Sequence, residues 1–129
     1  MSSLKIHNIL VVDDDPVQNK LLDGVLIQNG FKVRIADEAA IGLQEAMNGS
    51  PDLIILDVMM PIINGFNFCK LLKNQDLKKH IPIILLTSRT EEDDIKIGLE
   101  MGAEAYLGKP VNTQELLKII RMIENNLIA

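Results

Sequence analysis

Three nearly unbroken apolar runs constrain the fold of this chain more than any other feature of its sequence. They cover residues 9–12, 53–56 and 81–86. Strands this apolar are expected to be covered on both faces, which is typical of a parallel sheet between layers of helices. The sequence therefore predicts an α/β fold.

Helical and strand periods alternate five times along the 129 residues, without a repeat, a low-complexity segment or a linker. The expected strands cover residues 9–12, 31–36, 53–57, 81–86 and 106–107. The expected helices run from residue 16 to a stop at Asn29-Gly30, and over residues 39–48, 65–74, 90–101 and 112–126. Right-handed crossovers then predict one domain over residues 1–129. This domain is a doubly wound (βα)5 flavodoxin-like three-layer sandwich with a five-stranded parallel sheet in the order 2-1-3-4-5.

Two of the expected helices carry well-defined apolar faces. In the first helix, one face is shared by Val17, Leu21, Leu22, Val25 and Leu26. The last helix is capped by Asn112 or Thr113, and the residues expected to face the core are Leu116, Ile120, Ile123 and Leu127.

Composition excludes several classes of function. The net charge of −5 and the scattered lysines and arginines argue against direct nucleic-acid binding, which usually shows a basic face. No apolar stretch approaches the roughly 18 residues of a membrane span, and the polar N-terminus lacks a signal-peptide core. We therefore expect a cytoplasmic protein. Cys69 is the only cysteine, and its place in an apolar helical stripe favours a buried thiol over a nucleophile.

Polar side chains follow four of the expected strands. Asp13 and Asp14, with Asp15 beside them, follow the first strand, and Asp57 closes the third. Thr87 follows the fourth strand and Lys109 the short fifth one. Because ligands of such sheets bind at the carboxyl ends of the strands, these groups are expected to meet in one crevice.

Four motifs, at residues 9–16, 51–61, 82–88 and 102–110, resemble the receiver domain of two-component response regulators. The resemblance covers essentially the whole chain. It implies that Asp57 is the phosphoacceptor, that Asp13 and Asp14 hold Mg²⁺, and that Lys109 binds the phosphoryl group. It also implies that Thr87 is the switch hydroxyl, that Tyr106 is the switch aromatic, and that a cis peptide bond precedes Pro110.

The chemistry of the residues agrees with these roles. An aspartate can attack phosphorus, but its own charge repels the incoming phosphoryl group unless a cation offsets it. Mg²⁺ prefers oxygen ligands, which fits Asp14 and Asp57 directly, Asp13 through water, and the backbone carbonyl of Met59. Three carboxylates carry a charge of −3, and Mg²⁺ with Lys109 carries +3, so the formal charges balance.

Each position also has a purely structural interpretation. Residues 13–15 could cap the first helix, Asp57 could end a strand, and Thr87 could cap the fourth helix. Lys109 could be a solvated lysine, and Tyr106 an ordinary edge-strand residue. Their convergence at one sheet edge favours the functional interpretation.

We therefore expect a phosphorylation switch, and not an enzyme. It takes a phosphoryl group from a sensor histidine kinase or phosphotransfer protein and signals to a downstream protein or a fused output domain. The sequence leaves open whether it acts alone or belongs to a longer protein. The alternative is a Mg²⁺-dependent phosphohydrolase with an aspartyl nucleophile, but Met59 stands two residues after Asp57, where no general acid is visible. A nucleotide-binding protein would need a Gly-rich loop after the first strand, which is missing.

Departures from the family pattern concern the output and the lifetime of the phosphorylated form. Ile62-Ile63 form an apolar pair that suits a partner contact, whereas Glu104-Ala105 puts a salt-bridged homodimer in doubt, so phosphorylation-dependent dimerisation stays open. Met59 and Arg89 cannot act as bases toward a water, which predicts a long-lived acyl phosphate. Two helices carry further apolar residues, which form either a docking surface or extra core: Ile97, Met101, Ile119 and Met122.

Overall fold

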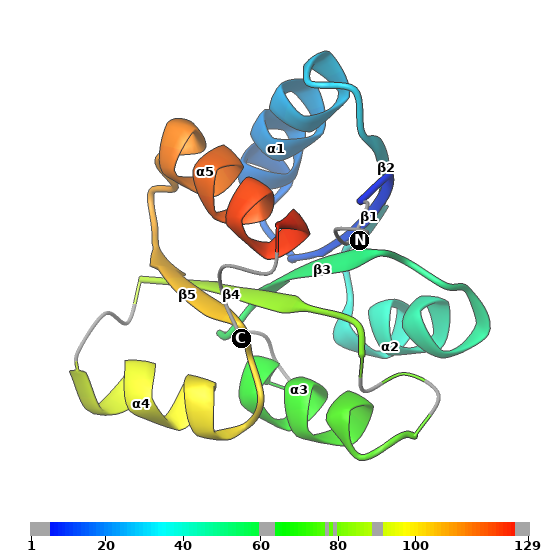
Figure 1. Cartoon of the computed structure of the whole chain (residues 1–129), viewed down its shortest axis with the longest axis vertical. Coiled ribbons are helices and arrows are strands. Elements are labelled where there is room, and N and C mark those ends of the chain that lie inside the picture. Colours follow the sequence, from blue (N-terminus) through cyan, green and yellow to red (C-terminus); the bar gives the residue numbers. More distant parts are fainter. Residues whose placement is uncertain (1–5, 60–63, 77, 79, 89–91, 126–129) are drawn as a thin grey trace.

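The computed structural model describes residues 6–59, 64–76, 78, 80–88 and 92–125. Strands and helices alternate along the chain (Figure 1). The strands are β1 (Asn8–Val12), β2 (Lys32–Ala36), β3 (Leu53–Asp57), β4 (Ile83–Thr87) and β5 (Ala105–Gly108). The helices are α1 (Pro16–Gln28), α2 (Ala39–Asn48), α3 (Gly65–Lys73), α4 (Glu92–Glu100) and α5 (Thr113–Glu124).

The five strands form one parallel sheet in the order β2-β1-β3-β4-β5, which confirms the predicted topology. Figure 1 shows α1 and α5 on one face of the sheet and α2, α3 and α4 on the other, as the three-layer prediction requires. The register pairs Val12 with Leu56, and Thr87 with Gly108. The carboxyl ends of the strands therefore lie level with one another at one edge.

Each face of the sheet packs against its own apolar cluster. The cluster between the sheet and helices α2 and α3 includes Val12 and Leu56 of the sheet and Phe68 of α3, and the cluster on the side of α1 and α5 includes Val11 and Ile55. All residues of β3 and β4 are buried, which explains why these two strands are apolar almost without interruption. Within the described residues, no helix is long and apolar enough to cross a membrane.

The apolar face predicted for α1 is only partly correct. Leu22 and Leu26 are fully buried, but Val17 is 78% exposed and Leu21 is 45% exposed. The helix is rotated so that the amide side chains of Gln18 and Asn19 lie inside instead. In α5, the described residues of the predicted core face are buried, namely Leu116, Ile120 and Ile123, whereas position 127 lies outside the described residues.

Element ends differ slightly from the predicted ones, for local reasons. Strand β4 begins at Ile83, two residues later than predicted, since Pro82 has no N–H group for a sheet ladder. Helix α1 is capped by Asp15, whose side chain accepts hydrogen bonds from the first turn. Asn112, and not Thr113, caps α5, because its side chain accepts a hydrogen bond from the backbone N–H of Glu115.

Candidate functional site

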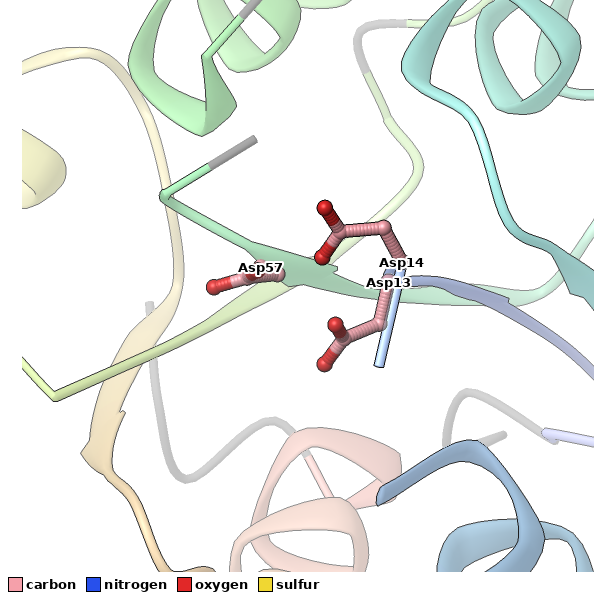
Figure 2. Close-up of side chains that lie close together, drawn as sticks. All are labelled: Asp13, Asp14 and Asp57. Carbon is pink, nitrogen blue, oxygen red and sulfur yellow. The ribbon is translucent and has the colours of Figure 1, made fainter. Parts of the chain in front are cut away.

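The predicted acidic residues meet at the carboxyl edge of the sheet. Asp13 and Asp14 directly follow β1, and Asp57 is the last residue of the neighbouring strand β3. One carboxylate oxygen from each residue lies within 4.8 Å of the other two. Figure 2 shows Asp13 and Asp14 leaving the end of β1 in opposite directions, with Asp57 beside them. The structure thus brings the three predicted metal ligands together.

Asp13 is the most tightly held of the three carboxylates. It is only 1% exposed, and its backbone N–H donates to the carbonyl of Ala36 at 3.1 Å. Its Oδ1 accepts from the backbone N–H of Asp15 at 3.0 Å, and its Oδ2 accepts from the Lys109 ammonium at 2.8 Å. The capping role considered for residues 13–15 therefore belongs to Asp15.

Asp57 is buried at the mouth of the crevice and contacts Lys109. Its Oδ1 accepts from the backbone N–H of Met59 at 3.2 Å and lies 3.5 Å from the Lys109 Nζ. Its other oxygen, Oδ2, has no hydrogen-bond partner among the described residues. One oxygen is therefore held by the protein while the other remains available for chemistry.

Helix α3 packs against the backbone that follows Asp57. The N–H of Gly65 donates to the carbonyl of Val58 at 2.9 Å. A Cβ atom at Gly65 would lie 2.6 Å from the Cα of Val58 and 2.8 Å from the carbonyl oxygen of Asp57. Only glycine allows this close approach, which fixes the end of β3.

The charges in the crevice change the proton affinities of the buried groups. Burial and the nearby negative charge of Asp13 raise the pKa of Asp57, although the Met59 N–H and Lys109 oppose the change. Burial would lower the pKa of Lys109, but its hydrogen bond and ion pair with Asp13, helped by Asp57, raise the pKa overall. Two buried carboxylates thus share one ammonium group, and a cation would relieve their repulsion.

Lys109 and Thr87 are placed by the pairing of β4 with β5. The backbone N–H of Lys109 donates to the carbonyl of Thr87 at 2.8 Å, and Thr87 is fully buried. The peptide bond between Lys109 and Pro110 is cis, as predicted. The structure therefore brings Thr87 and Lys109 to the same sheet edge as the acidic residues.

Tyr106 lies on β5 and is half-buried, with its ring against α4. A Cβ atom at Gly98 would lie 2.9 Å from the Tyr106 Cδ2 and 2.8 Å from the Leu85 Cδ1. Gly98 therefore lets the tyrosine ring pack directly on the helix. The switch roles of Thr87 and Tyr106 stay predictions at this point.

Other predicted surface features are only partly described. Residues 62, 63 and 89 lie outside the described part of the chain. Met59, two residues after Asp57, is 53% exposed, and its proposed part in metal binding stays a prediction. Of the possible docking residues, Ile97 is exposed, whereas Met101 and Ile119 pack against the two core clusters.

Sequence reasoning missed one buried contact of residues 13–15, the acidic turn that follows β1. The side-chain amide of Asn19 donates to the backbone carbonyl of Asp13 at 2.7 Å. The apolar pattern of α1 suggested that Val17 and Leu21 face inward and gave no signal for Asn19. A polar residue that lies one helical turn after the Asp15 cap is the only clue.

The three carboxylates suit a hard divalent cation. Mg²⁺ takes oxygen ligands and usually binds through one or two carboxylates with several waters. Asp14 is exposed, so it can bind an ion and still leave room for water, while Asp13 and Asp57 add buried negative charge. The residues present therefore fit Mg²⁺.

Comparisons with known proteins identify the family. Residues 9–121 match the model of the response regulator receiver domain. The transcriptional regulatory protein GltR of Pseudomonas aeruginosa is 40% identical over 117 residues, which are 91% of this chain and 48% of GltR. The phosphate regulon transcriptional regulatory protein PhoB of Escherichia coli is 38% identical over 117 residues, 91% of this chain and 51% of PhoB. The chain thus spans about half the length of the curated relatives that it matches.

A solved structure agrees with this assignment. The chemotaxis protein CheY4 of Vibrio cholerae superposes with a TM-score of 0.85 at 32% identity, over 92% of this chain and 99% of CheY4. At this coverage, the match includes most of the five-stranded parallel sheet that positions the acidic crevice here. The chain belongs to the response regulator receiver domain family, the phosphoacceptor domains of two-component systems.

Proposed function

We propose that Asp57 is the residue that accepts the phosphoryl group. The observation that carries this proposal is the position of its carboxylate, which is buried at the strand edge, 3.5 Å from the Lys109 ammonium and beside the acidic pair. An oxygen of Asp57 forms a bond to phosphorus, while the bond from phosphorus to a histidine nitrogen of the donor breaks. The electron pair of that bond stays on the nitrogen. The donor is a sensor histidine kinase or a phosphotransfer protein.

The acidic residues would hold Mg²⁺ during the transfer. Asp14 and Asp57 would bind it directly, Asp13 through a water, and Met59 through its backbone carbonyl. The ion supplies positive charge that offsets the repulsion between the carboxylate and the incoming phosphoryl group. Lys109, which already contacts both Asp13 and Asp57, would stabilise the negative charge that the phosphoryl group adds.

Thr87 and Tyr106 would transmit the change. Once Asp57 carries a phosphoryl group, the Thr87 hydroxyl moves toward its oxygens and Tyr106 turns inward. The altered surface of α4, β5 and α5 then binds a downstream protein or a fused output domain. Relatives of twice this length are named transcriptional regulators, which supports a fused output domain. We place the whole chain, residues 1–129, in one cytoplasmic receiver domain. This domain does not itself bind nucleic acid and does not lie on a membrane. A homodimer would form only on phosphorylation.

Acetyl phosphate tests the phosphoacceptor. With Mg²⁺ present, the parent protein should gain one phosphoryl group by intact mass, and Asp57→Asn should gain none. Asp23→Asn, in the middle of α1, is the matched control and should behave like the parent. Labelling of Asp57→Asn to the same extent as the parent would refute the proposal, and steady turnover of a phosphomonoester would favour the phosphohydrolase.

A further inference from the structure

We propose that Asn19 is a positioning residue that sets the geometry of the Mg²⁺ site, an inference that rests on the function proposed above. Asn19 lies in α1, is 6% exposed, and donates from its Nδ2 to the carbonyl of Asp13 at 2.7 Å. The side chain does not reach a carboxylate itself. It acts through the backbone that carries two of them.

The carbonyl of Asp13 controls the direction of Asp14. The C=O of Asp13 and the N–H of Asp14 belong to one planar peptide unit, so fixing the carbonyl oxygen fixes the plane from which Asp14 continues. Among the described residues, no hydrogen bond or ion pair holds the Asp14 carboxylate itself. Its direction therefore depends on the backbone, and Asn19 is the side chain that fixes this peptide unit.

No other polar group of Asp13 is bound by Asn19. The other polar groups of Asp13 are bound elsewhere: its N–H to Ala36, its Oδ1 to Asp15 and its Oδ2 to Lys109. In turn, the backbone N–H of Asn19 donates to the carbonyl of Asp15 at 3.0 Å. Asn19 thus ties the first turn of α1 to the acidic turn through both its backbone and its side chain.

Stability alone does not account for an asparagine at this position. Its Oδ1 is buried and has no hydrogen-bond partner among the described atoms. A buried polar atom without a partner costs free energy, and an aliphatic side chain of similar size would avoid that cost. What asparagine provides and an aliphatic side chain cannot is the hydrogen bond from Nδ2 to the Asp13 carbonyl, which holds the backbone of the proposed Mg²⁺ site.

Gln18 provides a matched control. It is the neighbouring residue of α1, it is 8% exposed, and its Nε2 is also buried without a hydrogen-bond partner. Its side chain forms no hydrogen bond to the acidic turn among the described residues. Replacing either amide by leucine removes a buried polar group from the same helix, but only Asn19→Leu releases the Asp13 carbonyl.

The experiment is a Mg²⁺ titration of the full chain, followed by amide NMR, for the parent, Asn19→Leu and Gln18→Leu. Loss of a group that orients a metal ligand typically weakens binding 10–100-fold, so we expect Asn19→Leu to bind Mg²⁺ at least about tenfold more weakly. Gln18→Leu should stay within about twofold of the parent. Urea unfolding should show that both variants are fully folded under the conditions of the titration, so that the weaker Mg²⁺ binding of Asn19→Leu does not come from loss of the fold.

Each outcome separates this inference from the proposed function. A parent that does not bind Mg²⁺ would refute the metal site itself. Binding by the parent and by Asn19→Leu with equal affinity would overturn only the positioning role. Equal weakening in both variants would also overturn it, because general packing would then explain the loss. If Asn19→Leu does not fold, Asn19→Ala removes the same amide without added bulk and decides between the same outcomes.

Discussion

Replacing Glu104 by alanine should lower the free energy of unfolding, although Glu104 lies at the starts of the strands and the acidic crevice at their carboxyl ends. The Glu104 carboxylate lies 3.1 Å from the Lys73 Nζ and accepts the backbone N–H of Ile83 at 2.8 Å. The same ammonium donates to the carbonyl of Ile81 at 2.7 Å. The Lys73 and Glu104 side chains are only 13% and 22% exposed. This cluster joins the end of α3 to the starts of β4 and β5.

The size of the effect follows from these contacts. A hydrogen bond to a charged group contributes about 1.5–3 kcal/mol, and removing one partner of a buried ion pair costs about 3–5 kcal/mol in all, with the lower end for a pair that is partly exposed. We therefore expect Glu104→Ala to lose about 3 kcal/mol of unfolding free energy. For 129 residues, an unfolding entropy of about 2.1 cal/mol/K per residue gives roughly 0.27 kcal/mol/K, so Tm should fall by about 11 °C.

Calorimetry and urea unfolding of matched variants test this estimate. Glu104→Gln keeps an acceptor for the Ile83 N–H but loses the charge, so it should cost only about 1 kcal/mol. Glu45→Ala is the control, because its ion pair with Arg34 is exposed and should contribute less than about 0.5 kcal/mol. A Glu104→Ala variant that is no less stable than Glu45→Ala would contradict the stabilising role of the Lys73–Glu104 pair.

Three further perturbations address the switch, the buried thiol and the lifetime of the acyl phosphate. Gly98→Ala should displace the Tyr106 ring, since the added Cβ would lie 2.9 Å from its Cδ2; unchanged ring proton shifts would contradict this contact. Burial raises the pKa of the Cys69 thiol to about 11, so the folded chain keeps a proton that the unfolded chain loses. Stability should then fall from about pH 9 to about pH 11 by up to about 3 kcal/mol, and urea unfolding of Cys69→Ala should lack this part of the slope; parallel pH profiles would refute it. Met59→Asn combined with Arg89→Glu should speed loss of the phosphoryl group, because the new polar groups can hold the attacking water. Decay no faster than that of the parent would show that these two positions do not control the lifetime of the acyl phosphate.

The fold was predictable because its signals are local. The buried strands β3 and β4 read as apolar runs, and Asn29-Gly30 marks a helix end by its own backbone preferences. The candidate site was predictable for a related reason. Its residues stand at strand ends, and a parallel sheet brings all carboxyl ends to one edge.

Features that depend on distant parts of the chain were not predictable in the same way. The apolar residues of α1 cover more than one side of the helix, and the sheet and α5 decide which side is buried. Val17 and Leu21 therefore lie outside, while Asn19 lies inside. The pair of Lys73 and Glu104 joins residues 31 positions apart, and no periodicity in the sequence links them.

The burial of the acidic residues also separates the functional interpretation from the structural one. A carboxylate that merely ends a strand or caps a helix can stay in water, as Asp15 does at the start of α1. Asp13 and Asp57 are instead 1% and 4% exposed, and they share the single ammonium of Lys109. Burying a second negative charge without its own cation lowers the free energy of unfolding, and ending a strand or capping a helix does not offset this loss. Such excess negative charge is expected at a site that binds a divalent cation and accepts a phosphoryl group, as in the receiver domain family.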